Sequence, residues 1–152
     1  MVAQSAGDER EQLSFDFLPD LPVVVQRHQG QLSSDAGLLP IRQFDQRWKY
    51  TQRLAACLHD PRPDRLHSLA SMLRQRLYGS LAGSQDCNDH DTHLYDPVFK
   101  LVTGKMPQHD ALASQPTLSR FENIATPAEL QKFIGFNIQT GIERLKQKHG
   151  GQ

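Results

Sequence analysis

The chain has 152 residues, of which 38% are hydrophobic and 22% are charged, enough for one domain with a core. Seventeen basic and seventeen acidic residues give a formal net charge of zero, which argues against a simple polycation. No apolar run reaches the length of a membrane span, and the first residues do not read as a signal peptide. Because the two cysteines fit reduced thiols, we expect a cytoplasmic protein with no membrane contact.

Strand signals lie near the amino terminus. Residues 1–20 are predicted to be disordered or extended, and apolar and polar residues alternate over 13–17 as in a half-buried strand. The β-branched run 23–25, followed by a turn at Gly30, predicts a small hairpin over residues 22–34. Such a hairpin is marginal alone, so we expect it to pack against helices.

A first helix is predicted over residues 36–48, with Ser34 or Asp35 as the N-cap. Arg42 and Arg47 fall outside its apolar stripe, so we expect both side chains to face away from the core. The stripe that the helix would bury consists of Leu38, Ile41, Phe44 and Trp48.

The longest amphipathic pattern follows a short helix predicted around residues 54–58. It is capped by Asp64, ends near Gly83, and leaves Arg74 and Arg76 off its apolar face. A leucine stripe of this length could support dimerisation, but burial within the same domain is the favoured interpretation. The stripe consists of Leu66, Leu69, Leu73, Leu77 and Leu81.

Three more helices are expected in the carboxyl-terminal half. Asp96 caps a short helix that Gly104 ends, and Ser114 caps another that has Pro116 in its first turn. Residues 126–129 form a capping box for the last helix. Its expected apolar face consists of Leu130, Phe133, Ile134, Ile138, Ile142 and Leu145.

The segment 86–93 is rich in potential metal ligands. Cys87, His90 and His93 are three residues apart, so a helix would bring them to one face. Structural zinc sites usually take two ligand pairs from different elements, and no second pair stands at matching spacing. A polar surface helix is therefore the favoured interpretation of this segment. The alternative is a metal site whose ligands are Cys87, His90 and His93.

Two separate stretches carry a resemblance to a known family. Residues 31–39 read QLSSDAGLL and residues 113–123 read ASQPTLSRFEN, with a helical region between them. Together they resemble the amino-terminal part of a bacterial insertion-sequence transposase of the "transposase DDE domain, group 1" family. The resemblance runs from about residue 23 to residue 123, with a looser continuation. It implies a family that cuts and joins DNA at an Asp-Asp-Glu metal site.

The resemblance also implies that the catalytic core is absent, because the family's first catalytic Asp lies on a strand beyond the equivalent of Gln152. No run of strands follows residue 34, and a metal-dependent nuclease needs acids that converge on a rigid scaffold. We therefore expect a chain that is not an enzyme. We expect no cofactor in this chain, and we expect Mg²⁺ to bind only to the missing catalytic core.

Positive charge gathers in the middle of the chain. Between residues 42 and 76, eight basic residues stand against three acids, a net charge of +5. From charge alone a solvated helix face is the favoured interpretation, although steering of DNA depends on such local fields. If the chain binds DNA, the candidate residues are Arg42, Arg47, Arg74, Arg76, Ser119 and Arg120.

The sequence thus predicts a mainly α fold of about five to seven helices with a small amino-terminal β-hairpin. We divide it into an amino-terminal segment over 1–20, a helical domain with the hairpin over 21–124, and a carboxyl-terminal helix over 125–152. The expected function is DNA binding at insertion-sequence ends, or transposase assembly, in DNA transposition. The alternatives are a protein-interaction or dimerisation fragment, pairing with itself or a full-length transposase, and a non-functional remnant of an insertion sequence.

Overall fold

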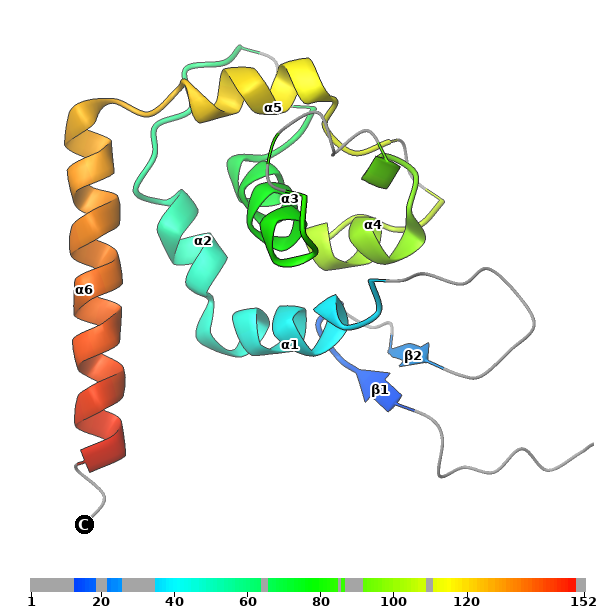
Figure 1. The fold of residues 1–152 in the computed structure, drawn as a ribbon, viewed down its shortest axis with the longest axis horizontal. Helices are drawn as coiled ribbons and strands as arrows, with labels where there is room; N and C mark the ends of the chain where they lie inside the picture. The colour runs from blue at the N-terminus through cyan, green and yellow to red at the C-terminus, as the bar shows by residue number, and fades with distance from the viewer. Residues whose placement is uncertain are drawn as a thin grey trace, which may run out of the picture.

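The computed structural model describes residues 13–18, 22–25, 35–63, 66–84, 86, 92–108 and 111–149. Over these residues a two-stranded antiparallel sheet is followed by six helices, which confirms the predicted mainly α fold (Figure 1). Helices α1 to α5 surround a common core, whereas α6 runs along one side of the molecule. Within these ranges no helix has both the length and the apolar character to cross a membrane.

The sheet joins β1 (Leu13–Phe15) to β2 (Val23–Val25). The alternation predicted over 13–17 is confirmed only in part: Phe15 and Phe17 are buried and Asp16 between them is exposed, but Leu13 is 62% exposed. The strand that pairs with β2 differs from the prediction. It is the upstream strand β1, which is anchored by its buried aromatic side chains, whereas the expected partner segment lies outside the described residues.

Several predicted helix starts are confirmed. Asp96 accepts a hydrogen bond from a first-turn amide, and Thr126 and Glu129 form the reciprocal capping box. The helices are α1 (Leu38–Trp48), α2 (Tyr50–Ala55), α3 (Leu69–Leu81), α4 (Pro97–Thr103), α5 (Gln115–Glu122) and α6 (Pro127–His149).

Two helix starts differ from the prediction. Helix α1 begins after Gly37 without a side-chain cap, so Asp35 does not cap it. Helix α3 is capped by Ser68, which accepts from the amide of Ser71, rather than by the earlier Asp64. Lys49 has a left-handed φ of 51° and separates α1 from α2, so the second helix begins several residues before its predicted position.

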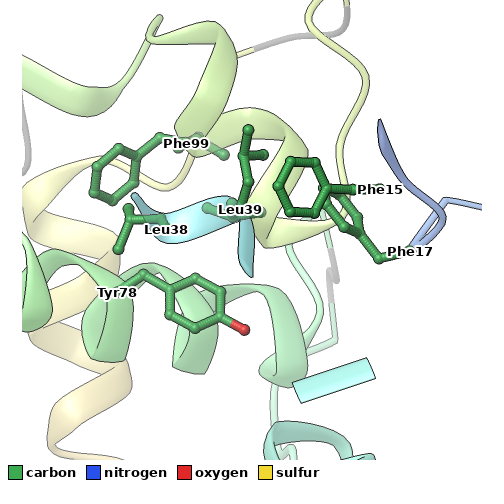
Figure 2. Packing of buried hydrophobic residues seen from close by; sticks show 8 residues of the cluster. Phe15, Phe17, Leu38, Leu39, Tyr78 and Phe99 are labelled. Carbon is green, nitrogen blue, oxygen red and sulfur yellow. The ribbon is translucent and has the colours of Figure 1, made fainter. Parts of the chain in front are cut away.

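The core consists of two clusters that share α3. The first lies between the sheet, α1, α3 and α4, and contains Phe15, Phe17, Leu38, Leu39, Tyr78, Phe99, Val102 and Leu112 (Figure 2). The second lies between α2, α3 and α5, and contains Leu54, Ala55, Met72, Leu73, Ala113, Leu118 and Phe121. The leucine stripe of α3 is thus buried in its middle, while its ends, Leu66 and Leu81, are exposed.

The buried face of α1 also differs from the prediction. Leu38 and Leu39 are buried, but Ile41 and Phe44 are exposed by 37% and 47%. Leu38 and Leu39 both pack in the first cluster, so the residues one and two turns later on the same face of the helix are buried as well. Those positions hold Arg42 and Asp45, so a charged pair occupies the side predicted to face solvent.

Candidate nucleic-acid interface

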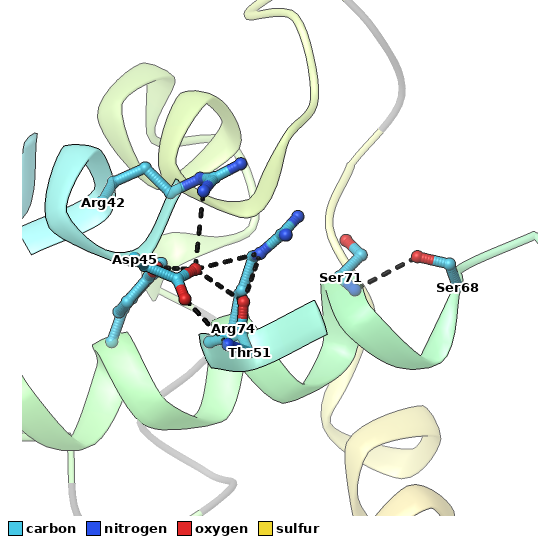
Figure 3. A network of polar contacts seen from close by, with 7 residues as sticks. Arg42, Asp45, Thr51, Ser68, Ser71 and Arg74 are labelled. Atoms are coloured by element: carbon cyan, nitrogen blue, oxygen red, sulfur yellow. Dashed lines mark hydrogen bonds and ion pairs between the residues drawn. The ribbon is translucent and has the colours of Figure 1, made fainter. Parts of the chain in front are cut away.

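Arg42 and Arg74, two of the arginines predicted to bind DNA, form ion pairs with Asp45 inside the fold. Arg42 is only 4% exposed, and its Nη1 lies 3.4 Å from Asp45 Oδ2 (Figure 3). Arg74 Nε lies 3.5 Å from the same oxygen and donates to Thr51 Oγ1 at 2.9 Å. The placement of Arg42 on the solvent side was therefore wrong, and neither guanidinium is presented as a free surface cation.

Asp45 joins three helices through this network. It accepts hydrogen bonds from the Thr51 amide at 2.7 Å, the Thr51 hydroxyl at 2.5 Å and the Tyr78 hydroxyl at 2.9 Å. Burial and the charge of Asp45 raise the pKa of Tyr78, so its hydroxyl remains a donor at neutral pH. Burial and the neighbouring Arg74 lower the pKa of Arg42. These polar groups pair with one another inside the fold, except that Arg42 Nε is buried without a hydrogen-bond partner.

The other predicted DNA-binding residues lie on separate surfaces. Arg76 Nε lies 2.5 Å from Glu122 Oε1, an ion pair that joins α3 to α5. Arg47 is exposed on α1, beside Asp16. Ser119 is half-buried and Arg120 is exposed on α5. The structure therefore does not bring the six candidates together in one site, and among them Arg47 and Arg120 are the most accessible cations.

Arg120 instead belongs to a cleft of about 490 Å³ beside the start of α5. The cleft combines basic side chains with two hydroxyl groups and a few apolar contacts. Its lining consists of Arg62, Leu66, His67, Ala111, Leu112, Ser114, Thr117 and Arg120.

The inner wall of this cleft is electropositive. Lys105 Nζ lies 3.1 Å from His67 Nδ1 and donates to the carbonyl of Ala111 at 3.0 Å. Arg62 donates to Asp60 at 2.7 Å and to the carbonyl of His67 at 2.9 Å. Burial, followed by Lys105 and Arg62, lowers the pKa of His67, so the imidazole is neutral at pH 7. Arg62 is thus paired with Asp60, and the cleft has two further permanent cations, Lys105 behind His67 and Arg120 in its lining.

The start of α5 adds further donors to the cleft. Ser114 occupies the predicted N-cap position, but its hydroxyl lies 3.1 Å from Thr117 Oγ1 and makes no cap hydrogen bond to the helix amides. Both hydroxyls line the cleft, next to the positive end of the helix dipole. Hydroxyls, a guanidinium and a helix start form a donor set that suits phosphate oxygens.

The described residues give little support to a metal site formed by Cys87, His90 and His93. Cys87 and His90 lie outside them, and His93 is held within the fold. Its ring stacks on Phe99 with centroids 3.9 Å apart, and its Nε2 lies 2.7 Å from Ser84 Oγ. Within the described ranges no group of three His, Cys, Asp or Glu side chains could hold a metal ion. These residues do not fit an Asp-Asp-Glu site, and we assign no metal-dependent step to them.

Sequence analysis missed the inner wall of the cleft. Arg62 is one of the eight basic residues between 42 and 76, and nothing in its local sequence distinguishes it from the others. His67 lies 38 residues from Lys105, within the stretch predicted as a helix from its leucine stripe, and that pattern gives no sign of a contact with Lys105. Only the tertiary structure brings these segments together, so no local signal could have identified the site.

Comparison with known proteins identifies a family. The model of a family described as Transposase DDE domain group 1 matches residues 15–149. No curated protein and no solved structure matches the chain. The family match confirms the resemblance carried by residues 31–39 and 113–123, and it extends well beyond them.

The same match overturns the expectation that the catalytic domain is absent and that the chain is not an enzyme. The family domain is present along nearly the whole chain, and nothing in the match indicates missing catalytic residues. The expectation depended on where the chain ends relative to the family's first catalytic strand. Because the family model matches residues 15–149, the position of the chain's end does not show that the family domain is absent.

Proposed function

Because the chain belongs to the Transposase DDE domain group 1 family and so has a transposase-related role, we propose that it binds duplex DNA. The observation that carries this proposal is the electropositive cleft at the start of α5. Arg120 would contact the DNA backbone directly, while Arg62 and Lys105 contribute positive potential from behind it.

The chemistry of the cleft favours phosphate over base edges. A guanidinium donates two parallel hydrogen bonds to phosphate oxygens, and a hydroxyl or helix start adds single donors. Such contacts set the register of a protein on DNA without reading its sequence. We therefore assign the cleft a positioning role on the backbone.

The finer features of the function are also proposals. The DNA would be the ends of a bacterial insertion sequence, and the reaction served would be transposition in the cytoplasm; the family match supports transposition in general. Binding itself would need no metal cofactor, because protein cations supply the contacts. Affinity for DNA should therefore be unchanged by EDTA.

Fluorescence anisotropy with a labelled duplex tests the proposal. Affinity should fall steeply as salt rises, and Arg120→Ala should lower the salt slope by about 1 on every sequence. Arg47→Ala is the matched control, because Arg47 is also an exposed helical arginine but lines a different cleft, with Asp16 and Gln43. Absence of binding in low salt, or equal loss in both variants, would contradict the assignment.

The dimerisation alternative based on the α3 stripe is not favoured. Leu73 is 6% exposed and packs in the second cluster, so the middle of that stripe is already used within the chain. A chain that fails to bind DNA under all salt conditions would favour the remnant alternative.

A further inference from the structure

Helix α6 is attached to the rest of the molecule along one face. The ring of Tyr50 lies 5.4 Å from that of Phe136, and its hydroxyl donates to Asn137. Near the end of the helix, the guanidinium of Arg144 lies 4.6 Å from the ring centroid of Phe44 and 5.3 Å from that of Trp48. These contacts come from the α1–α2 side, where Figure 1 places the helix.

A second face of α6 is apolar and exposed. Its side chains form a contiguous stripe, of the size at which exposed apolar patches mark interaction surfaces. The stripe consists of Leu130, Ile134, Ile138, Ile142 and Leu145, whose exposed fractions are 50%, 60%, 59%, 41% and 60%. A 23-residue helix is about 35 Å long, so this face and its flanks offer on the order of the 800 Å² that each partner contributes to a stable interface.

The stripe is nearly palindromic about Ile138. Ile134 and Ile142 stand four residues to either side of it, and Gly135 and Gly141 stand three residues to either side. Leucines lie near both ends, eight residues before and seven residues after the centre. A pattern that reads alike in both directions is self-complementary when two helices run antiparallel about a two-fold axis.

The two glycines support the same geometry. A Cβ added at Gly135 or Gly141 would meet no atom within 4 Å, and neither residue has a positive φ. Each glycine costs about 0.5–1 kcal/mol relative to alanine in a helix interior. Within the described residues, neither backbone conformation nor packing requires glycine there. Glycine would be required at these positions if each forms a hole on the helix surface that receives a side chain from a second helix.

We propose that two copies of this chain pair through the exposed stripes of α6, antiparallel about Ile138. In this arrangement Ile138 of one copy meets Ile138 of the other. Ile134 lies level with Ile142 of the other copy, one residue from that copy's Gly141, and Gly135 lies level with Gly141. The side chains of Ile134 and Ile142 pack into the space beside the glycines of the other copy, in the way that ridges pack into grooves between helices. No stripe residue lines the DNA cleft, so each copy keeps its cleft.

Sedimentation over a concentration series tests the pairing. The natural chain should shift from monomer to dimer as its concentration rises, and Ile138→Lys should abolish the shift while circular dichroism retains the helix signal. Gln139→Lys places the same charge on the adjacent residue, outside the stripe, and should leave the dimer intact. A natural chain that stays monomeric at its highest soluble concentration would overturn the proposal, and so would an Ile138→Lys chain that still dimerises.

Gly141→Ala provides a second variant whose failure cannot be attributed to unfolding. It should raise the thermal stability of the monomer, because alanine favours helix, while weakening the dimer by filling the hole. A dimer that is unaffected or strengthened would contradict the packing of Ile134 against Gly141.

Cysteine crosslinking tests the orientation. In a background with Cys57→Ser and Cys87→Ser, Ile138→Cys should form a disulfide-linked dimer. Leu145→Cys should not link to itself but should link to Leu130→Cys in a mixture of the two variants. Self-linkage at position 145 would indicate parallel helices and would overturn the antiparallel arrangement. None of these readouts depends on DNA, so they are independent of the proposed DNA contact.

Discussion

The body formed by α1 to α5 and the single helix α6 use similar apolar stripes in different ways. Leu73 on α3 is 6% exposed, whereas Ile138 on α6 is 59% exposed. Helix α3 contributes to both core clusters, while α6 adds only partly buried side chains to one of them. Apolar periodicity therefore predicts that a helix has a contact face, but it does not say whether the partner belongs to the same chain.

The two regions also differ in how polar groups stabilise them. In the body, Asp45 connects α1, α2 and α3 from a buried position. Beyond the first turn of α6, the ion pair to the body lies near the surface: Arg53 pairs with Glu143 at 3.9 Å, and both side chains are 45% exposed. Because solvent screens exposed pairs, we expect the body to hold most of the stability and α6 to be attached weakly.

The largest effect should follow from removing the central acid. Asp45→Ala leaves Arg42 and Arg74 without their buried counter-charge, and breaking such a pair costs about 3–5 kcal/mol. Urea unfolding measures the loss. The control Asp16→Ala removes an exposed carboxylate that accepts from Gln43 and should change the unfolding free energy by less than about 0.5 kcal/mol. Equal effects would mean that the network does not organise the core.

A matched pair of aliphatic truncations compares the two regions directly. Leu118→Ala empties a site that is 0% exposed and should cost about 2–5 kcal/mol. Ile138→Ala, measured where the chain is monomeric, should cost less than about 0.5 kcal/mol apart from helix propensity. If Ile138→Ala were as costly as Leu118→Ala, the stripe of α6 would be buried within the same chain.

The start of α6 should give a pH-dependent effect. Glu129 accepts hydrogen bonds from the Thr126 hydroxyl and amide and from the His59 amide, which lower its pKa to about 2. A lowered folded-state pKa stabilises the fold above the unfolded value near 4.5, and this contribution is lost as pH falls toward 2. The stability difference between the natural chain and Glu129→Gln should therefore shrink over that window. A constant difference would show that the charge is not responsible.

The smallest effect on global stability should come from the far end of α6. Arg144→Ala removes the contacts with Phe44 and Trp48, each worth about 0.5–1 kcal/mol at exposed sites. Hydrogen exchange should accelerate in the last turns of α6 and remain unchanged in α3. Lys148→Ala is the control, because no described contact of its side chain joins α6 to the body. Uniform acceleration across all helices would indicate that α6 and the body unfold together.

Local signals in the sequence determined much of the helix pattern. The capping box at Thr126 and Glu129, the cap at Asp96 and the glycine after α4 act within one turn of chain. The placement of Ser114 and Pro116 at the start of α5 is local in the same way. At the starts of α4 and α6 neighbouring residues satisfy the backbone groups, so no distant partner is needed to predict these elements.

The choice of buried face was decided by the tertiary structure. Helix α1 carries apolar residues on two sides, and its periodicity alone favours Leu38, Ile41, Phe44 and Trp48, of which only Leu38 is buried. Burial of Arg42 and Asp45 becomes possible only because α2 and α3 bring donors to the same carboxylate. The gain from these distant hydrogen bonds offsets the cost of removing charge from water, and a periodic pattern contains no information about it.

The candidate site shows the same division. The sequence by itself determined that the chain resembles its family and that Arg120 lies on a short helix with a proline in its first turn. Which cations share a cleft with Arg120 was decided by loops that meet across 38 residues, as in the contact of His67 with Lys105. Electrostatic potential depends on distances in space, so a net charge of +5 along the chain did not identify the cleft.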